Sequence, residues 1–154
     1  MATTLKFNAI DNLISNIKKL NSDSILKKVL ADSKLQQDIL DLNRLGQLYN
    51  EGVDSDGKFL GNYTSYSIDR KLDGDGDHRI DHITLKDTGE FYDSFKFKNN
   101  VDSFVIKADT IKPDQDLAYV YGAKILGLNA KSLSILRSEI LPPVRTMVLA
   151  QIRK

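Results

Sequence analysis

The most distinctive polar stretch of the sequence is 73–81, which reads Asp-Gly-Asp-Gly-Asp-His-Arg-Ile-Asp. Its carboxylates occupy the first, third, fifth and ninth places of an EF-hand-type loop. Calcium takes six to eight oxygen ligands, and this spacing can supply several of them. A calcium-binding module is therefore one hypothesis for this stretch, with the metal held by Asp73, Asp75, Asp77 and Asp81.

Two positions of the stretch depart from a calcium loop. The sixth place requires glycine for a sharp turn and is His78, and the twelfth requires a bidentate glutamate and is Thr84. The flanking residues do not form a clear pair of helices either. The sequence favours a solvated acidic turn at this place, and no cofactor is expected.

The two histidines of the chain, His78 and His82, lie four positions apart, at i and i+4. On a helix this spacing can chelate zinc. The glycine-rich context argues against a helix, and no third ligand is evident. We interpret both as loop residues, and a small hydrolase or toxin that uses either histidine remains an alternative hypothesis.

The tripeptide Asp87-Thr88-Gly89 has the letters of an aspartic protease signature, but Glu90 and the amphipathic run 91–95 follow it. That context favours a helix cap and turn. The sequence has no cysteine, no phosphate-binding glycine loop and no nucleophile motif with an evident base. We therefore expect a protein that is not an enzyme.

Charge and hydropathy narrow the possible partners. The 22 basic and 21 acidic side chains give a net charge of +1, whereas a sequence-independent nucleic-acid binder usually has a basic excess. No direct nucleic-acid role is expected. Apolar runs are only a few residues long, so no membrane partner is expected, and the N-terminus lacks the features of a signal peptide.

Residues 1–50 are predicted to be helical from their apolar spacing. A first helix would follow Asn8, a second would begin at Asp23 or Ser24, and a third would be capped by Asp32 or Ser33. The buried faces are predicted to carry, in turn, Ile10, Leu13, Ile14, Ile17 and Leu20; Ile25, Leu26, Val29 and Leu30; and Leu35, Ile39, Leu42, Leu45 and Tyr49.

The rest of the chain changes character at Gly52. Residues 52–82 are predicted to form a long polar loop or arm. In 83–110 we expect a short helix and then a β-hairpin with strands near 94–99 and 103–109. A short element is expected at 117–121, and a C-terminal helix within 130–154 is expected to begin at Ser132 and to kink near Leu141, before Pro142-Pro143. The prediction is one α+β domain spanning 1–154, with helices packed on a small antiparallel sheet.

Three segments, in this order, resemble the tail-completion or virion-morphogenesis proteins of tailed bacteriophages. They are the glycine and Ser/Thr-rich stretch 57–71, the apolar–Asp-Thr-Gly–short-helix stretch 83–95, and the hairpin followed by Leu117-Ala-Tyr-Val-Tyr-Gly122. The C-terminal part is similar to phage or prophage proteins of Bacteroidetes.

The resemblance implies a structural virion protein of the head–tail junction: a connector, neck or tail-completion ring. Its implied partners are copies of itself in a ring and the neighbouring portal, neck or tail proteins. Its implied location is the virion, after synthesis in the cytoplasm of the bacterial host. The 52–82 loop and the 130–154 helix are the contact elements expected from this interpretation.

Overall fold

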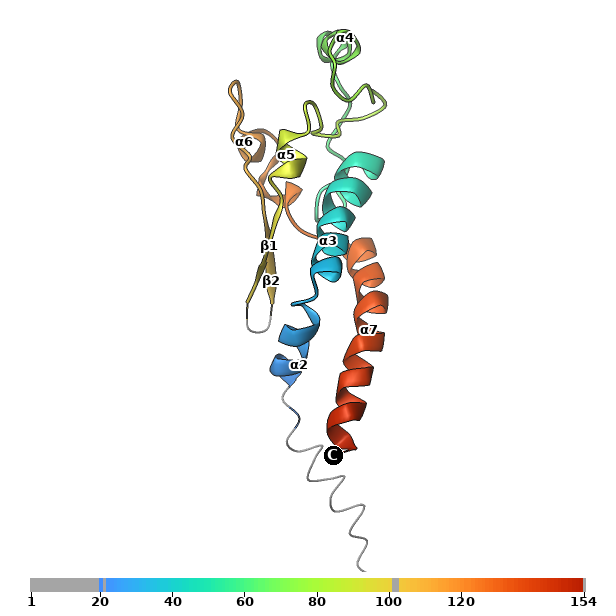
Figure 1. Cartoon of the computed structure of the whole chain (residues 1–154). Helices are drawn as coiled ribbons and strands as arrows, with labels where there is room; N and C mark the ends of the chain where they lie inside the picture. The colour runs from blue at the N-terminus through green and yellow to red at the C-terminus, as the bar shows by residue number, and fades with distance from the viewer. Residues whose placement is uncertain (1–19, 21, 101–102, 154) are drawn as a thin grey trace, which may run out of the picture.

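The computed structural model describes residues 20, 22–100 and 103–153, and the predicted helix after Asn8 lies outside them apart from Leu20. The protein has a small α+β fold in which helices pack on a two-stranded antiparallel sheet. Figure 1 shows three layers along a long axis: the β-hairpin, a central column of helices, and the long C-terminal helix. The hairpin packs on α3, and the C-terminal helix packs on α2 and η1.

The two helices predicted from apolar spacing after Asn21 are confirmed. Helix α2 spans Ser22–Val29 and buries Ile25 and Val29, and α3 spans Ser33–Asp41 and buries Leu35 and Ile39. Asp32 caps α3, because its carboxylate accepts a 2.8 Å hydrogen bond from the backbone N–H of Leu35.

Element η1, Leu42–Glu51, continues α3 as a π-helix. Its i→i+5 hydrogen bonds widen each turn, so the inward face moves about one residue along the sequence. The buried positions are therefore Asn43, Gln47 and Leu48. The prediction that Leu45 lies on the buried face was wrong, because this side chain is 41% exposed.

The stretch 52–82 is not a continuous loop. Thr64 caps a helix, α4 (Ser65–Asp73), by accepting a hydrogen bond from the backbone N–H of Ser67. The chain before it is folded by an antiparallel bridge between Val53 and Phe59. Helix α4 forms one end of the molecule (Figure 1), so an arm exists but contains regular structure.

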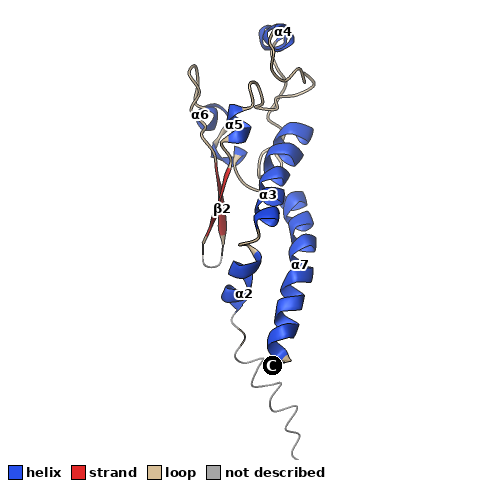
Figure 2. Ribbon diagram, viewed as in Figure 1, coloured by secondary structure: helices blue, strands red, loops and turns tan. Residues whose placement is uncertain are grey.

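The Asp-Thr-Gly turn leads into a short helix and then the hairpin, as predicted. Gly89 (φ 97°) is the left-handed residue before α5, Glu90–Asp93. Strands β1 (Lys96–Asn99) and β2 (Phe104–Lys107) follow, with Phe97 opposite Ile106. Figure 2 shows both strands beside the central helices, and their inner face adds to the core.

The C-terminal part contains α6 (Leu117–Tyr121), the 3₁₀ turn η2 (Ala123–Ile125) and α7 (Ala130–Ile152). Asn129 is the N-cap of α7, so the predicted start at Ser132 was two residues late. Leu136, Ile140, Val144 and Met147 face the core, whereas Leu133 is 45% exposed.

Helix α7 continues through Pro142 and Pro143 as a single element. The two prolines remove the donors for the carbonyls of Ser138 and Glu139. Both of those residues are exposed, so water can hydrate the two carbonyl groups. The helix in Figure 2 runs unbroken alongside α2 and α3.

Candidate functional site

The acidic stretch 73–81 is organised around a buried ion pair. Lys71, in the last turn of α4, places Nζ 3.2 Å from Oδ2 of Asp77, and the two side chains are 7% and 8% exposed. The same ammonium group donates a 2.7 Å hydrogen bond to the carbonyl of Lys86. Lys71 therefore fastens the end of α4 to two places in the chain that follows it.

Uncharged groups complete the surroundings of Asp77. The hydroxyl of Tyr49 donates to Oδ1 at 2.9 Å, and that of Thr84 donates to Oδ2 at 3.4 Å. Tyr63 lies within hydrogen-bond distance of the Thr84 hydroxyl, at 3.1 Å, and its ring centroid is 5.0 Å from Nζ of Lys71. The cluster therefore joins the π-helix, the arm and the chain before α5.

The four predicted calcium ligands do not converge. Asp77 is bound to Lys71, and Asp81 forms an ion pair with Arg79 whose closest distance is 2.8 Å. Asp73 and Asp75 are exposed. In the described residues, no three acidic or histidine side chains come together as a possible metal site. The geometry gives the calcium hypothesis no support.

The two histidines are separated in the fold. His82 is 6% exposed, and its Nε2 lies 2.9 Å from the carbonyl oxygen of Tyr49. The ring packs on Gly52, where a Cβ would lie 2.4 Å from Cδ2 of His82, so glycine is required there. His78 is exposed and contacts the carbonyl of Gly74 at 2.7 Å. They do not form a chelating pair.

Asp81 is held ionised on the other side of His82. Its two hydrogen bonds with the Arg79 guanidinium group lower the pKa of the Asp81 carboxyl to about 2. Nδ1 of His82 lies 3.1 Å from Oδ2 of Asp81. Both ring nitrogens of His82 therefore have neighbours, which gives this residue a structural role.

Asp87 has no catalytic surroundings. Its backbone carbonyl accepts a 3.1 Å hydrogen bond from the N–H of Asp77, and its side chain is exposed. Gly76 packs against it so closely that a Cβ there would lie 2.6 Å from the Asp87 carbonyl oxygen. The Asp-Thr-Gly stretch thus positions α5 and the acidic stretch.

A second buried polar cluster fixes the start of α7, and sequence reasoning missed it. Gln47 donates to the carbonyl of Gly127 at 3.0 Å and accepts from the N–H of Asn129 at 2.8 Å. Asn43 likewise donates to the carbonyl of Ile125 at 3.1 Å and accepts from the N–H of Gly127 at 3.0 Å. Each side-chain amide therefore pairs with one backbone carbonyl and one backbone N–H of the segment before α7, as a neighbouring β-strand would.

The burial of Tyr92 leads us to expect a lower free energy of unfolding in alkaline solution. Burial raises the pKa of Tyr92 far above its ordinary value of 10, and its hydroxyl donates to the carbonyl of Thr84 at 2.5 Å. The folded state keeps this proton where the unfolded chain releases it, so stability is fully present below pH 10 and falls above it. The slope should approach about 1.4 kcal/mol per pH unit.

Urea unfolding at a series of pH values checks this expectation. Tyr92→Phe should flatten the alkaline slope, whereas Tyr119→Phe should leave it unchanged, because the Tyr119 side chain is 89% exposed. Equal slopes for wild type and Tyr92→Phe would contradict the assignment.

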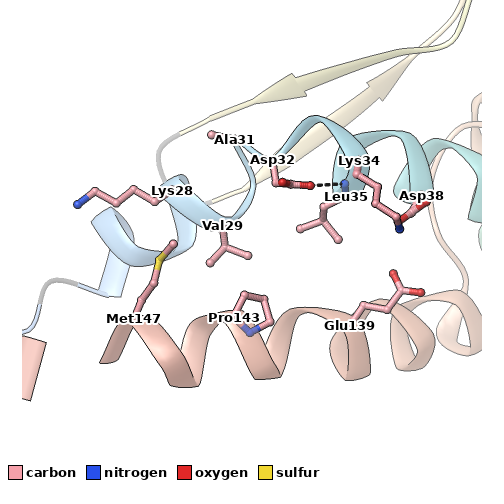
Figure 3. Close-up of a pocket in the computed structure, with 10 residues that line it drawn as sticks. All are labelled: Lys28, Val29, Ala31, Asp32, Lys34, Leu35, Asp38, Glu139, Pro143 and Met147. Atoms are coloured by element: carbon pink, nitrogen blue, oxygen red, sulfur yellow. Dashed lines mark hydrogen bonds and ion pairs between the residues drawn. The ribbon is translucent and has the colours of Figure 1, made fainter. Parts of the chain in front are cut away.

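A groove separates the central helices from α7 (Figure 3). It has a volume of about 670 Å³ and is lined by residues of α2, α3 and α7. Charged side chains at its edge include the ion pair between Lys34 and Asp38, with Glu139 across from it. Pro143 and Met147 form an apolar wall. The mixed lining and the open form do not define a small-molecule site.

Large apolar side chains are exposed at separate places. On the arm, Tyr66 is 71% and Leu72 51% exposed. On α6, Tyr119 is 89% exposed, and Ile111, which precedes that helix, is 72% exposed. Ile111 is bridged to Asp116, the residue that caps α6, so it lies next to that helix. These positions are candidates for contact with other proteins.

None of the helices in the described part of the chain has the length and apolar character needed to cross a membrane. Comparison with known proteins gave no match to a protein-family model, to a curated protein or to a solved structure.

Proposed function

We propose that this chain is a structural protein of the head–tail junction of a tailed bacteriophage. It would act as a connector, neck or tail-completion component and would catalyse no reaction. Copies would form a ring that contacts the neighbouring portal, neck or tail proteins. The protein would be made in the host cytoplasm and would function in the virion.

The observation that carries this proposal is the placement of exposed apolar side chains on different surfaces. One surface is on α4, with Tyr66 and Leu72, and another is at α6, with Tyr119 on the helix and Ile111 beside it. Helix α7 exposes further apolar side chains, such as Leu141 at 58%. Different surfaces on one chain suit heterologous, head-to-tail contacts, which close into rings when the rotation permits. A protein that functions by assembly would use such surfaces as contacts with its neighbours.

The three segments of the phage resemblance lie next to these surfaces. Segment 57–71 contains most of α4, segment 83–95 contains the turn and α5, and the third segment ends in α6 and Gly122. The polar groups considered for catalysis are engaged in structure, as the contacts of Asp77 and His82 illustrate. This use of polar groups favours an architectural role.

Mass spectrometry of purified particles, from the phage that carries this sequence, tests the proposal. The chain should be present at a fixed ratio to the portal protein. A double variant, Ile111→Ser with Tyr119→Ser, should keep the wild-type unfolding free energy within about 0.5 kcal/mol, because both side chains are exposed. It should nevertheless be depleted from particles, since it loses apolar contact area.

Lys58→Ser provides the control. Lys58 is exposed and polar, so its replacement removes no apolar contact area, and this variant should be incorporated into particles normally. Absence of the chain from particles, or wild-type incorporation of the double variant, would contradict the proposal. Point substitutions are preferable to deletion of the arm, which would also remove Lys71 and Asp77 from the buried cluster.

A further inference from the structure

The outer face of the hairpin carries an unusual concentration of lysine. Lys96 lies directly opposite Lys107 in the strand register, and Lys98 lies opposite Val105 on the same face. All four residues are exposed, with Val105 at 42%. We call these four residues the basic face.

The basic face is held in place by the core. Phe97 and Ile106 point to the opposite side of the hairpin, where they join the core, and Phe97 stacks on Phe104 with ring centroids 5.1 Å apart. A slip of one residue would expose these apolar side chains, so the register is fixed. The lysines cannot turn inward.

Like charges directly opposite one another destabilise a strand pair. No acidic side chain forms an ion pair with Lys96, Lys98 or Lys107 in the part of the chain that the structure describes. Lys27 adds positive charge nearby, because its carbonyl accepts a 3.4 Å hydrogen bond from Asn99 at the end of β1. An acidic partner would relieve this repulsion.

The arm carries the complementary surface. Asp69, Asp73 and Asp75 are exposed on or just after α4, and Leu72 lies among them at 51% exposure. We call these four residues the acidic tip. Two neighbouring cations are already neutralised within the arm, Lys71 by Asp77 and Arg79 by Asp81. Arg70 is also exposed on α4, so the three carboxylates of the tip outnumber the one remaining cation of the helix by two.

The two surfaces match in pattern, since each combines like charges with one exposed aliphatic side chain. They are well separated in Figure 1: α4 forms one end of the molecule, and β1 and β2 lie further along it. One molecule therefore presents both surfaces without joining them. The net charge of +1 leaves almost no basic excess over the whole chain, which argues against nucleic acid as the partner.

We propose that the basic face of one copy docks on the acidic tip of the next copy. The proposal rests on the proposed function, because it names a contact through which copies would form the ring. The contact is heterologous, so each copy uses both surfaces and can bind two neighbours. It buries two aliphatic side chains between opposite charges.

Crosslinking tests the contact directly, because the chain contains no cysteine and each introduced thiol is unique. Full-length Lys98→Cys and Asp73→Cys chains are mixed and treated with a short bismaleimide. The mixture should give a crosslinked dimer, and either chain alone should give little. The control mixture contains a Ser134→Cys chain in place of one of the two variants, because Ser134 is exposed on α7, away from both surfaces. A yield no higher than that of the control overturns the proposal.

Charge exchange gives an independent test by sedimentation velocity at low ionic strength. One variant carries Lys96→Glu and Lys98→Glu, and the other carries Asp73→Lys and Asp75→Lys. Each alone has two surfaces of the same sign and should remain monomeric, while an equimolar mixture should assemble as the wild type does. Added salt should weaken assembly.

A wild type that stays monomeric, or a mixture that fails to assemble, overturns the contact. If the variant with Lys96→Glu and Lys98→Glu loses affinity for a duplex DNA probe and the mixture does not assemble, the basic face binds nucleic acid and the proposed contact is overturned. Particle composition separates the two proposals. If the chain is absent from virions but the mixed charge variants assemble, only the head–tail function is overturned. If the chain is present in virions but the mixed variants do not assemble, only this contact is overturned.

Discussion

Replacing Lys71 with methionine is expected to lower the free energy of unfolding by about 3–5 kcal/mol, the range for breaking a buried ion pair. The substitution leaves the Asp77 carboxylate with its hydrogen bonds from Tyr49 and Thr84 but without its counter-ion. Methionine keeps most of the side-chain volume, so the loss reports the charge more than the packing. Urea unfolding followed by circular dichroism measures it.

The exposed pair of Lys34 and Asp38 provides a matched control, with side chains that are 83% and 36% exposed. Lys34→Met removes the same ammonium group from a solvent-exposed pair and should change the free energy of unfolding far less than Lys71→Met does. The double variant Lys71→Met with Asp77→Leu should be less destabilised than the sum of its single variants, because no charge is left unpaired. Equal effects of Lys71→Met and Lys34→Met would contradict the burial argument.

The second large effect is expected at Gln47. Gln47→Met removes the hydrogen bonds to Gly127 and Asn129 while preserving much of the volume. A buried carbonyl and a buried N–H then lack partners, and the expected loss is about 3 kcal/mol, because each unsatisfied group contributes roughly 1–3 kcal/mol. Asn129 caps α7, so we also expect faster hydrogen exchange in the first turn of that helix.

Gln37→Met is the control for this experiment. Gln37 is exposed on α3 and makes a 3.3 Å hydrogen bond to Asp41, so its replacement should change stability by less than about 0.5 kcal/mol. Protection factors from hydrogen exchange locate the effect. Uniform loss of protection, without a larger loss at the start of α7, would show that Gln47 does not act through this contact.

Local sequence determined the elements whose signals are self-contained. Apolar spacing and the Asp32 cap were sufficient for α2 and α3. The alternation of apolar and charged residues around Phe97 was sufficient for the hairpin. Gly89 could be recognised as a turn residue before α5, because it adopts a positive φ that other residues avoid. In each case the deciding interaction lies within a few residues of the chain.

Tertiary structure decided which polar residues are buried. A regular helical period places Leu45 inside, but the π-helix turns Asn43 and Gln47 inward instead. Their partners are backbone groups 80 to 84 residues away, so no local pattern could reveal the contact. Four hydrogen bonds, two of them buried and two partly buried, accompany the irregular helical turn.

The same reason explains the acidic stretch. The spacing of Asp73, Asp75, Asp77 and Asp81 in the sequence suggested a calcium-binding loop. Spacing alone does not determine which group a carboxylate binds. Lys71 reaches Asp77 only because α4 forms and folds back on the chain before α5. The sequence by itself specified the charges and the local elements, and the long-range packing determined which charges are neutralised inside and which remain on the surface.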